Sequence, residues 1–217
     1  MTTETKPLTG YDAQYAGDGH GKYNPKVEAP ILRNLVLGPA GTKPGYRVIE
    51  IGSGGGGAAD LLRIHGMKVE AVELSKMGKL AACRDYPSRA VTYRCEDAAN
   101  LTDIYRPECF ALLYARGMSW FHYELRDGEN CRGVNVREET AKLMTLVKPG
   151  GCFSLTICTN FSGDTPEKGV HQNTLEAYRE FMSLFGEIVH ESDWRGAPCD
   201  PDTKPYSGII ITVRKPE

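Results

Sequence analysis

The sequence lacks the features that would direct it to a membrane or to a nucleic acid. Its first residues have neither the basic start nor the apolar stretch of a secretory signal. No apolar run approaches the roughly 20 residues that a membrane-spanning helix requires. The formal net charge is −2 and the cations are scattered, so there is no electrostatic reason to expect nucleic acid or an anionic membrane as a partner. We therefore expect a cytoplasmic protein that binds neither.

Paired cysteines are also lacking. The chain has seven cysteines, an odd number, and no two of them form a CxxC pair. This pattern favours neither a disulfide framework nor a structural zinc site. Several of the cysteines lie in apolar segments, where cysteine usually acts as a small hydrophobic residue. The sequence predicts no bound metal and a reducing compartment.

What the chain does contain is a regular alternation of apolar runs and helix-like segments. With 41% hydrophobic and 25% charged residues, its composition is globular. Such alternation predicts a mostly parallel sheet covered by helices on both faces. We expect strands at residues 47–52, 68–74, 90–95, 109–115 and 151–158, with helices at 58–66, 75–86 and 137–147.

The two ends of the chain differ from this alternation. At the C-terminal end, a helix at 173–186 precedes two β-like runs, 187–194 and 208–215, which predict an antiparallel hairpin closing the sheet. Residues 1–45 are irregular apart from a short helix expected from Pro30 to Leu37. With no repeat and no linker, we expect one domain over residues 1–217, divided into an N-terminal lid or cap (1–45) and a core (46–217).

A glycine-rich turn follows the first expected strand, in the stretch VIEIGSGGGGAADLL. Gly52, Gly54 and Gly57 satisfy the pattern G-x-G-x-x-G, and Glu73 follows about 20 residues later at the end of the second strand. In an open α/β sheet, ligands bind beyond the carboxyl ends of the strands, next to such a turn. A carboxylate there can accept hydrogen bonds from both hydroxyls of a ribose. This pattern suits a dinucleotide and any other adenosine ligand equally well.

Acidic residues around the turn favour a cationic ligand over a phosphorylated one. Glu50 lies two residues before Gly52, where its charge would repel a pyrophosphate but suit an amino group or a sulfonium. Asp97 follows the third strand, where an adenine amino group could donate to it. We expect no basic residue beside these three acidic positions in the pocket. We therefore expect a pocket for a cationic nucleoside.

Five segments in order resemble the class I S-adenosylmethionine-dependent methyltransferases: VIEIGSGGG, VEAVELS, CEDAANL, LVKPGGCFSLTI and GIIITVRKP. The resemblance implies a Rossmann-like, doubly wound, seven-stranded α/β fold and S-adenosyl-L-methionine as cofactor. It implies that the glycines approach the methionine portion, that Glu73 binds the ribose, and that Asp97 with Ala98 binds the adenine. The implied cofactor site comprises Glu50, Gly52, Ser53, Gly54, Gly56, Glu73, Leu74, Asp97, Ala98 and Tyr114.

The segment YARGMSWFHY, after the fourth strand, is expected to line the methyl-transfer site. His122 is the residue there whose ordinary pKa is near neutrality, so it could deprotonate an acceptor or simply be a hydrogen-bonded histidine. Arg116 could bind a carboxylate of the substrate or cofactor, or form an ion pair with an acid of the protein. Trp120 is a candidate substrate contact. Three tyrosines of the N-terminal segment could form a lid over the site or pack against the sheet edge: Tyr11, Tyr15 and Tyr23.

The acceptor that these residues favour is a small molecule methylated at oxygen or nitrogen. No Asp/Asn-Pro-Pro-aromatic element follows the fourth strand, which argues against methylation of nucleobase amino groups by the family's usual arrangement. Three alternatives remain open. The chain could be a nicotinamide-dependent oxidoreductase, a cofactor-binding domain without acceptor site, or an enzyme that uses the sulfonium in another reaction.

Overall fold

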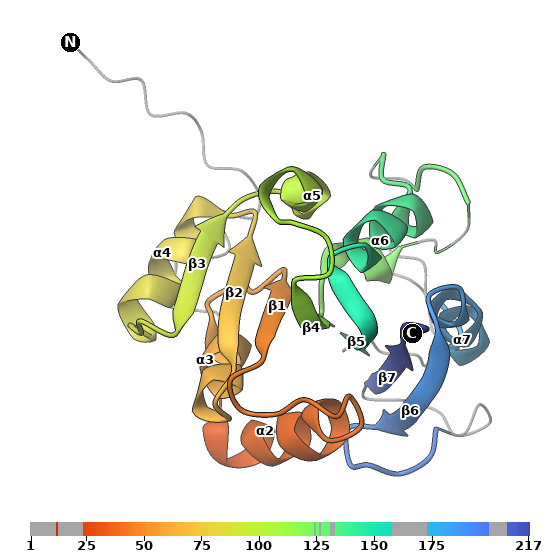
Figure 1. Cartoon of the computed structure of the whole chain (residues 1–217), viewed down its shortest axis with the longest axis horizontal. Helices are drawn as coiled ribbons and strands as arrows, with labels where there is room; N and C mark the ends of the chain where they lie inside the picture. Colours follow the sequence, from red (N-terminus) through yellow and green to blue (C-terminus); the bar gives the residue numbers. More distant parts are fainter. Residues whose placement is uncertain are drawn as a thin grey trace.

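The centre of the structure is a twisted sheet, seen in a computed structural model that describes residues 12, 24–123, 125, 127–130, 133–157, 173–199 and 208–217. Seven strands lie in the order β3-β2-β1-β4-β5-β7-β6 (Figure 1). Their bounds are β1 Arg47–Ile51, β2 Lys68–Glu73, β3 Val91–Cys95, β4 Phe110–Arg116, β5 Val147–Ile157, β6 Glu187–Asp193 and β7 Ile209–Arg214. The chain order reverses between β1 and β4, so the switch point lies where the glycine-rich turn follows β1.

Most neighbouring strands run parallel. β1 pairs with β2 and with β4 in parallel register, and the pairs β2–β3 and β4–β5 are parallel too. β7 is antiparallel to both of its neighbours, β5 and β6. The predicted fold class, a doubly wound and mostly parallel seven-stranded sheet with a C-terminal antiparallel hairpin, is confirmed. β7 lies inside the sheet, between β5 and β6, and β6 forms the edge.

Helices cover both faces of the sheet (Figure 1). They are α2 Pro25–Ile31, α3 Gly57–Ile64, α4 Lys76–Asp85, α5 Leu101–Ile104, α6 Val136–Met144 and α7 Leu175–Ser183, with the shorter or irregular segments η1 Leu32–Leu37, η2 Ala98–Asn100 and η3 Ser119–His122. Because side chains alternate between faces along a strand, two cores form. One packs α5, α6 and α7 against Ile49, Leu113 and Phe153, and the other packs η1 and α3 against Val48 and Leu112.

Two expected boundaries were wrong by four residues or more. The first helix begins at Pro25, with the Asn24 side chain capping it, and not at Pro30. Pro30 lies inside this helix, where its missing N–H removes one hydrogen bond, and the chain continues as the π-helical segment η1.

The strand expected from Gly151 begins four residues earlier, at Val147. It takes in the Lys148–Gly151 turn because Phe110 pairs with Val147 and a register shift follows before Leu112 pairs with Cys152.

In the part of the chain that the structure describes, no helix has both the length and the apolar composition to span a bilayer.

Candidate functional site

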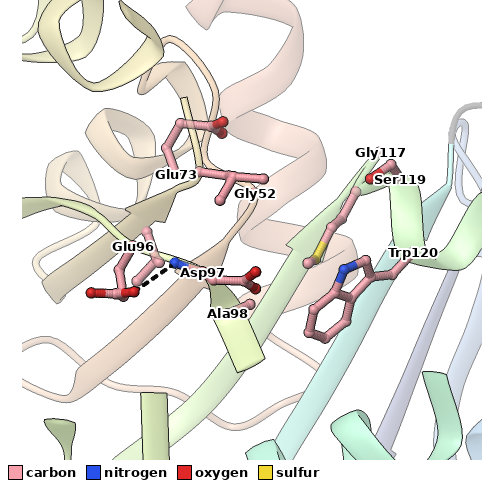
Figure 2. A pocket seen from close by; sticks show the side chains of 11 residues that line it. Gly52, Glu73, Glu96, Asp97, Ala98, Gly117, Ser119 and Trp120 are labelled. Atoms are coloured by element: carbon pink, nitrogen blue, oxygen red, sulfur yellow. Dashed lines mark hydrogen bonds between the residues drawn. The ribbon is translucent and has the colours of Figure 1, made fainter. Parts of the chain in front are cut away.

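A cavity lies at the carboxyl ends of β1, β2, β3 and β4. The cavity is open to solvent, and counted together with the open space at its mouth it measures about 590 Å³. Its lining residues are Gly52, Val72, Glu73, Leu74, Glu96, Asp97, Ala98, Gly117, Met118, Ser119 and Trp120. Figure 2 shows the acidic residues with Gly52 on one side of this cavity, and Ser119 with Trp120 on the other. The sequence-predicted residues Gly52, Glu73, Leu74, Asp97, Ala98 and Trp120 therefore lie together around one space.

The glycines of the turn are required for two different reasons. Gly52, Gly54 and Gly56 all have positive φ, at 67°, 53° and 82°, a region that residues with a Cβ rarely adopt. At Gly52 a Cβ would lie 3.0 Å from the Cγ of Met118, so the absence of a side chain allows Met118 to pack closely against the backbone of the turn. A Cβ at Gly56 would lie 2.6 Å from the Cβ of Ala82, which places Gly56 in the contact between α3 and α4. Gly56 thus serves packing and does not line the cavity.

The Glu73 carboxylate holds the glycine turn to the end of β2. Its Oε2 accepts a hydrogen bond from the Gly54 amide at 2.7 Å, and its Oε1 accepts one from the Ser75 amide at 2.9 Å. The side chain is largely buried, and burial raises the pKa of Glu73, although the backbone amides act in the opposite direction. Each carboxylate oxygen has a second lone pair, so Glu73 can hold the turn and still accept from a ligand. Ser53 is buried beneath the turn, with its amide bonded to the Val72 carbonyl.

Two neighbouring acids follow β3. Asp97 caps η2 by accepting from the Ala99 amide at 3.0 Å. Glu96 accepts from the Asp97 amide, drawn in Figure 2, and from the Asn100 side chain, and these bonds lower the pKa of Glu96. Sequence reasoning missed Glu96, although its place beside Asp97 could have indicated it. Within the described ranges, no three histidine, cysteine or acidic residues are grouped so that they could hold a metal ion.

The opposite wall is the segment that follows β4. Gly117, Met118 and Ser119 line the cavity together with Trp120, which the sequence singled out as a substrate contact. The sequence placed all of them in the segment expected to line the methyl-transfer site but singled out only Trp120 as a contact; Gly117 directly follows the end of β4. Leu74, 55% exposed, adds an apolar surface on the side of β2.

Glu50 lies behind this cavity and does not line it. Its side chain is 2% exposed, and no described residue forms a hydrogen bond with its Oε2. Burial raises the pKa of Glu50 to about 8, the charge of Arg116 acts to lower it, and that of Glu73 acts to raise it. A buried carboxyl with an unsatisfied oxygen is costly, so a cationic group delivered by a ligand would stabilise its ionised form.

A second, smaller cavity lies beside Arg116. Its lining includes Tyr114, Arg116 and Thr156 of the sheet, Glu28 of α2, and Trp194, which follows β6. Arg116 forms an ion pair with Glu28, and its guanidinium carbon lies 5.0 Å from the centroid of the Trp194 ring. Tyr114, expected among the cofactor contacts, is 3% exposed and borders this second cavity. The sequence left two roles open for Arg116, binding a carboxylate of a ligand or forming an ion pair within the protein. In the structure Arg116 forms the ion pair, with Glu28.

His122 ends η3, and its side chain is half-buried. Burial lowers the pKa of His122, while a hydrogen bond with the Gly117 backbone acts to raise it. The imidazole is therefore neutral at neutral pH, and it lies outside both sets of lining residues.

The tyrosines of the expected lid, Tyr11, Tyr15 and Tyr23, lie outside the described residues. Asp12, between them in the sequence, is described: its carboxylate accepts from the Ser75 hydroxyl at 2.7 Å, next to Glu73.

Solved structures share this fold. The chain is similar to a chain from the complex between the Haloferax volcanii Trm112 methyltransferase activator and a proposed methyltransferase, with a TM-score of 0.72, 13% identity and coverage of 98% of this chain and 100% of that one. It is similar to Haemonchus contortus phosphoethanolamine N-methyltransferase 2 in complex with S-adenosyl-L-methionine, with a TM-score of 0.64 and 16% identity, over 95% of this chain and 56% of that one. It is also similar to the [4+2]-cyclase SpnF, with a TM-score of 0.63 and 19% identity, over 92% and 85% of the two chains.

No protein-family model matches the chain, and neither does any curated protein sequence. At identities this low, the structural comparisons establish the fold and leave the reaction open. The chain has the fold of the class I S-adenosylmethionine-dependent methyltransferases, as its five resembling segments led us to expect.

Proposed function

We propose that this protein is an S-adenosyl-L-methionine-dependent methyltransferase that methylates an oxygen or nitrogen of a small molecule. The observation that carries the proposal is the charge of the larger cavity. Its charged lining residues are Glu73, Glu96 and Asp97, with no lysine or arginine among the described residues that line it. Such a site suits a nucleoside that carries a cation and disfavours the pyrophosphate of a nicotinamide dinucleotide.

The described side chains fit the parts of this cofactor. Glu73, already fixed by two backbone amides, is assigned to the ribose hydroxyls. Asp97, with Ala98 and the exposed Leu74, is assigned to the adenine. The buried Glu50, with its unsatisfied oxygen, is assigned to the positive charge of the methionine portion.

The remaining residues serve the transfer itself. When bound, the cofactor supplies an electrophilic methyl group. The protein has to align the acceptor and exclude water, and we assign this task to Met118 and Trp120 of the cavity wall. A neutral imidazole can accept a proton, so His122 remains the proposed base for a hydroxyl acceptor. The tyrosines of the expected lid, Tyr11, Tyr15 and Tyr23, are assigned to closing the site.

Cofactor binding is the first test. Calorimetry should show micromolar-range binding of S-adenosylmethionine and S-adenosylhomocysteine and no binding of NADH. Binding of NADH without either sulfur compound would replace the proposal with a nicotinamide-dependent oxidoreductase.

Turnover is the second test, because the fold also occurs in a cyclase. The protein is incubated with methyl-labelled cofactor and fractions of a small-molecule extract, and both label transfer and S-adenosylhomocysteine are measured. The proposal expects both in one fraction. Saturable binding without transfer would indicate a cofactor-binding domain, and consumption of the cofactor without S-adenosylhomocysteine would indicate another reaction of the sulfonium.

A further inference from the structure

Three ionisable side chains from distant parts of the chain interact near the second cavity: Glu28 and Arg116 line it, and the charge of Arg116 acts on Glu50. Glu28 belongs to α2, Glu50 to β1 and Arg116 to β4. In the parallel pair β1–β4, Glu50 lies opposite Tyr114. Arg116 follows Tyr114 by two residues, so its side chain lies on the same face of the sheet as those of Tyr114 and Glu50. This face is the one that η1 and α3 cover.

The guanidinium of Arg116 is held from two sides. Glu28 binds it by an ion pair, and the Trp194 ring lies against it at 5.0 Å. Both acids are within electrostatic reach of this one cation. Glu28 contacts the guanidinium directly, and the positive charge of Arg116 also acts on Glu50. Glu50 has the greater need for a positive charge, because it is 2% exposed and, unlike Glu28, has no ion pair among the described residues.

We propose that Arg116 is a positioning residue that sets the charge state of Glu50, and that Glu28 limits how much of the Arg116 charge reaches Glu50. The inference rests on the proposed function in one respect, the assignment of Glu50 to the cation of the cofactor. Arg116 thereby acts through Glu50 and does not clamp a carboxylate of the ligand. Helix α2, which carries Glu28, becomes part of the electrostatics of the cofactor site.

The physical basis is competition between two carboxylates for one guanidinium. A positive charge next to a buried carboxyl favours its ionised form, and a further negative charge disfavours it. Glu73 acts on Glu50 in the second sense, as burial does. The titratable and charged groups that face Glu50 from the elements around it are Glu73 of β2, Tyr93 of β3, Tyr114 and Arg116 of β4 and, through Arg116, Glu28 of α2.

The test is a direct titration of Glu50 in the full chain without any ligand. The protein is labelled with ¹³C at the glutamate carboxyls, and the Glu50 resonance is assigned as the one that Glu50→Gln removes. Arg116→Gln should raise the titration midpoint of Glu50, because it removes the attraction. Glu28→Gln should lower the midpoint, because it leaves the Arg116 charge to Glu50 alone. Shifts of opposite sign, each of about half a pH unit or more, are the expected result.

A matched control uses the second arginine–glutamate pair of this region. Arg47 lies on β1, the strand of Glu50, and pairs with Glu70 at 3.3 Å in a more exposed position. Arg47→Gln should leave the Glu50 midpoint unchanged. Arg116→Lys keeps the charge and should keep the midpoint closer to that of the wild type than Arg116→Gln does.

Shifts of the same sign in Arg116→Gln and Glu28→Gln, or no shift in either, would overturn the inference. Thermal melts check that each variant folds. If Arg116→Gln does not fold, Glu28→Gln decides the outcome alone by whether the midpoint falls. Failure of the proposed function shows elsewhere, as a wild-type protein that does not bind S-adenosylmethionine, and leaves these midpoints interpretable.

Discussion

At the scale of single residues, Glu73 combines a structural task with a proposed binding task. Its two oxygens accept from the Gly54 and Ser75 amides, which fixes the glycine turn against the end of β2. The same carboxylate lines the cavity. The second lone pair of each oxygen can accept from a further donor, so a ribose can bind without breaking the turn.

Replacing Glu73 therefore tests the ribose assignment. Glu73→Ala should weaken binding of S-adenosylhomocysteine by roughly 1.5–3 kcal/mol, the value of hydrogen bonds to a charged group. Titration calorimetry measures the change. Glu70→Gln is the control, because Glu70 lies on the same strand but bonds to Arg47 and Tyr105 away from the cavity. Equal affinities of Glu73→Ala and the wild type would remove Glu73 from the cofactor site.

At the scale of elements, Gly56 lets α3 and α4 approach each other. A Cβ there would come within 2.6 Å of Ala82 on α4 and within 3.0 Å of Tyr93 on β3. The neighbouring Gly55 has open space around the corresponding position and no positive φ. Two adjacent glycines of one turn thus differ in what an added methyl group would meet.

We expect Gly56→Ala to destabilise the fold by about 1–3 kcal/mol, because it adds overpacking to an unfavourable φ. Gly55→Ala should change the free energy of unfolding little. Urea denaturation of the two variants beside the wild type measures both values. Similar losses in both variants would show that the α3–α4 contact does not depend on Gly56.

Element positions could be predicted largely from the sequence, because buried parallel strands are short apolar runs separated by helices. The predicted boundaries were wrong where a contact elsewhere in the structure overrode a local sequence rule. Pro30 reads as a helix start, yet the Asn24 cap begins the helix earlier. Lys148–Gly151 reads as a turn, yet pairing with β4 keeps it within β5. The Arg116–Glu28 ion pair joins residues far apart in the chain, and no local pattern encodes such a partner.

At the scale of the whole molecule, the stability of the fold depends on the protonation of Glu50. Burial raises its pKa to about 8 from an ordinary 4.5. Between these values the carboxyl is protonated in the folded chain and ionised in the unfolded one, so the folded state binds more protons. The contribution of Glu50 to stability is therefore lost as the pH rises from about 4.5 to 8.

Glu50→Gln should remove this dependence. Relative to the variant, the wild type should lose up to ~1.4 kcal/mol of unfolding free energy for each pH unit within that window. Urea denaturation of both proteins from pH 5 to pH 9 gives the difference in their unfolding free energies. The contributions of the other titrating groups cancel in this difference. A difference that stays constant with pH would mean that Glu50 is ionised in the folded chain throughout.

The site was predictable from the sequence where it follows strand ends. Gly52, Glu73 and Asp97 each lie at a strand end or within two residues after it, and parallel strands bring their carboxyl ends to one edge. Met118 and Ser119 carry no such pattern, because their exposure to the cavity depends on how the chain leaves β4. The burial of Glu50 depends on the packing of several elements together, which composition alone does not give.

The insertion of β7 between β5 and β6 has a consequence for how the protein is made. β6 precedes β7 in the chain, so while a ribosome is still synthesising residues 209–214 the nascent β6 has no strand to pair with. The edge of β5 stays unpaired for the same interval, and its free backbone N–H and C=O groups can pair with strands of other chains. Synthesis of residues 209–214 thus completes this side of the sheet, and slowing translation just before them should increase aggregation of the newborn protein.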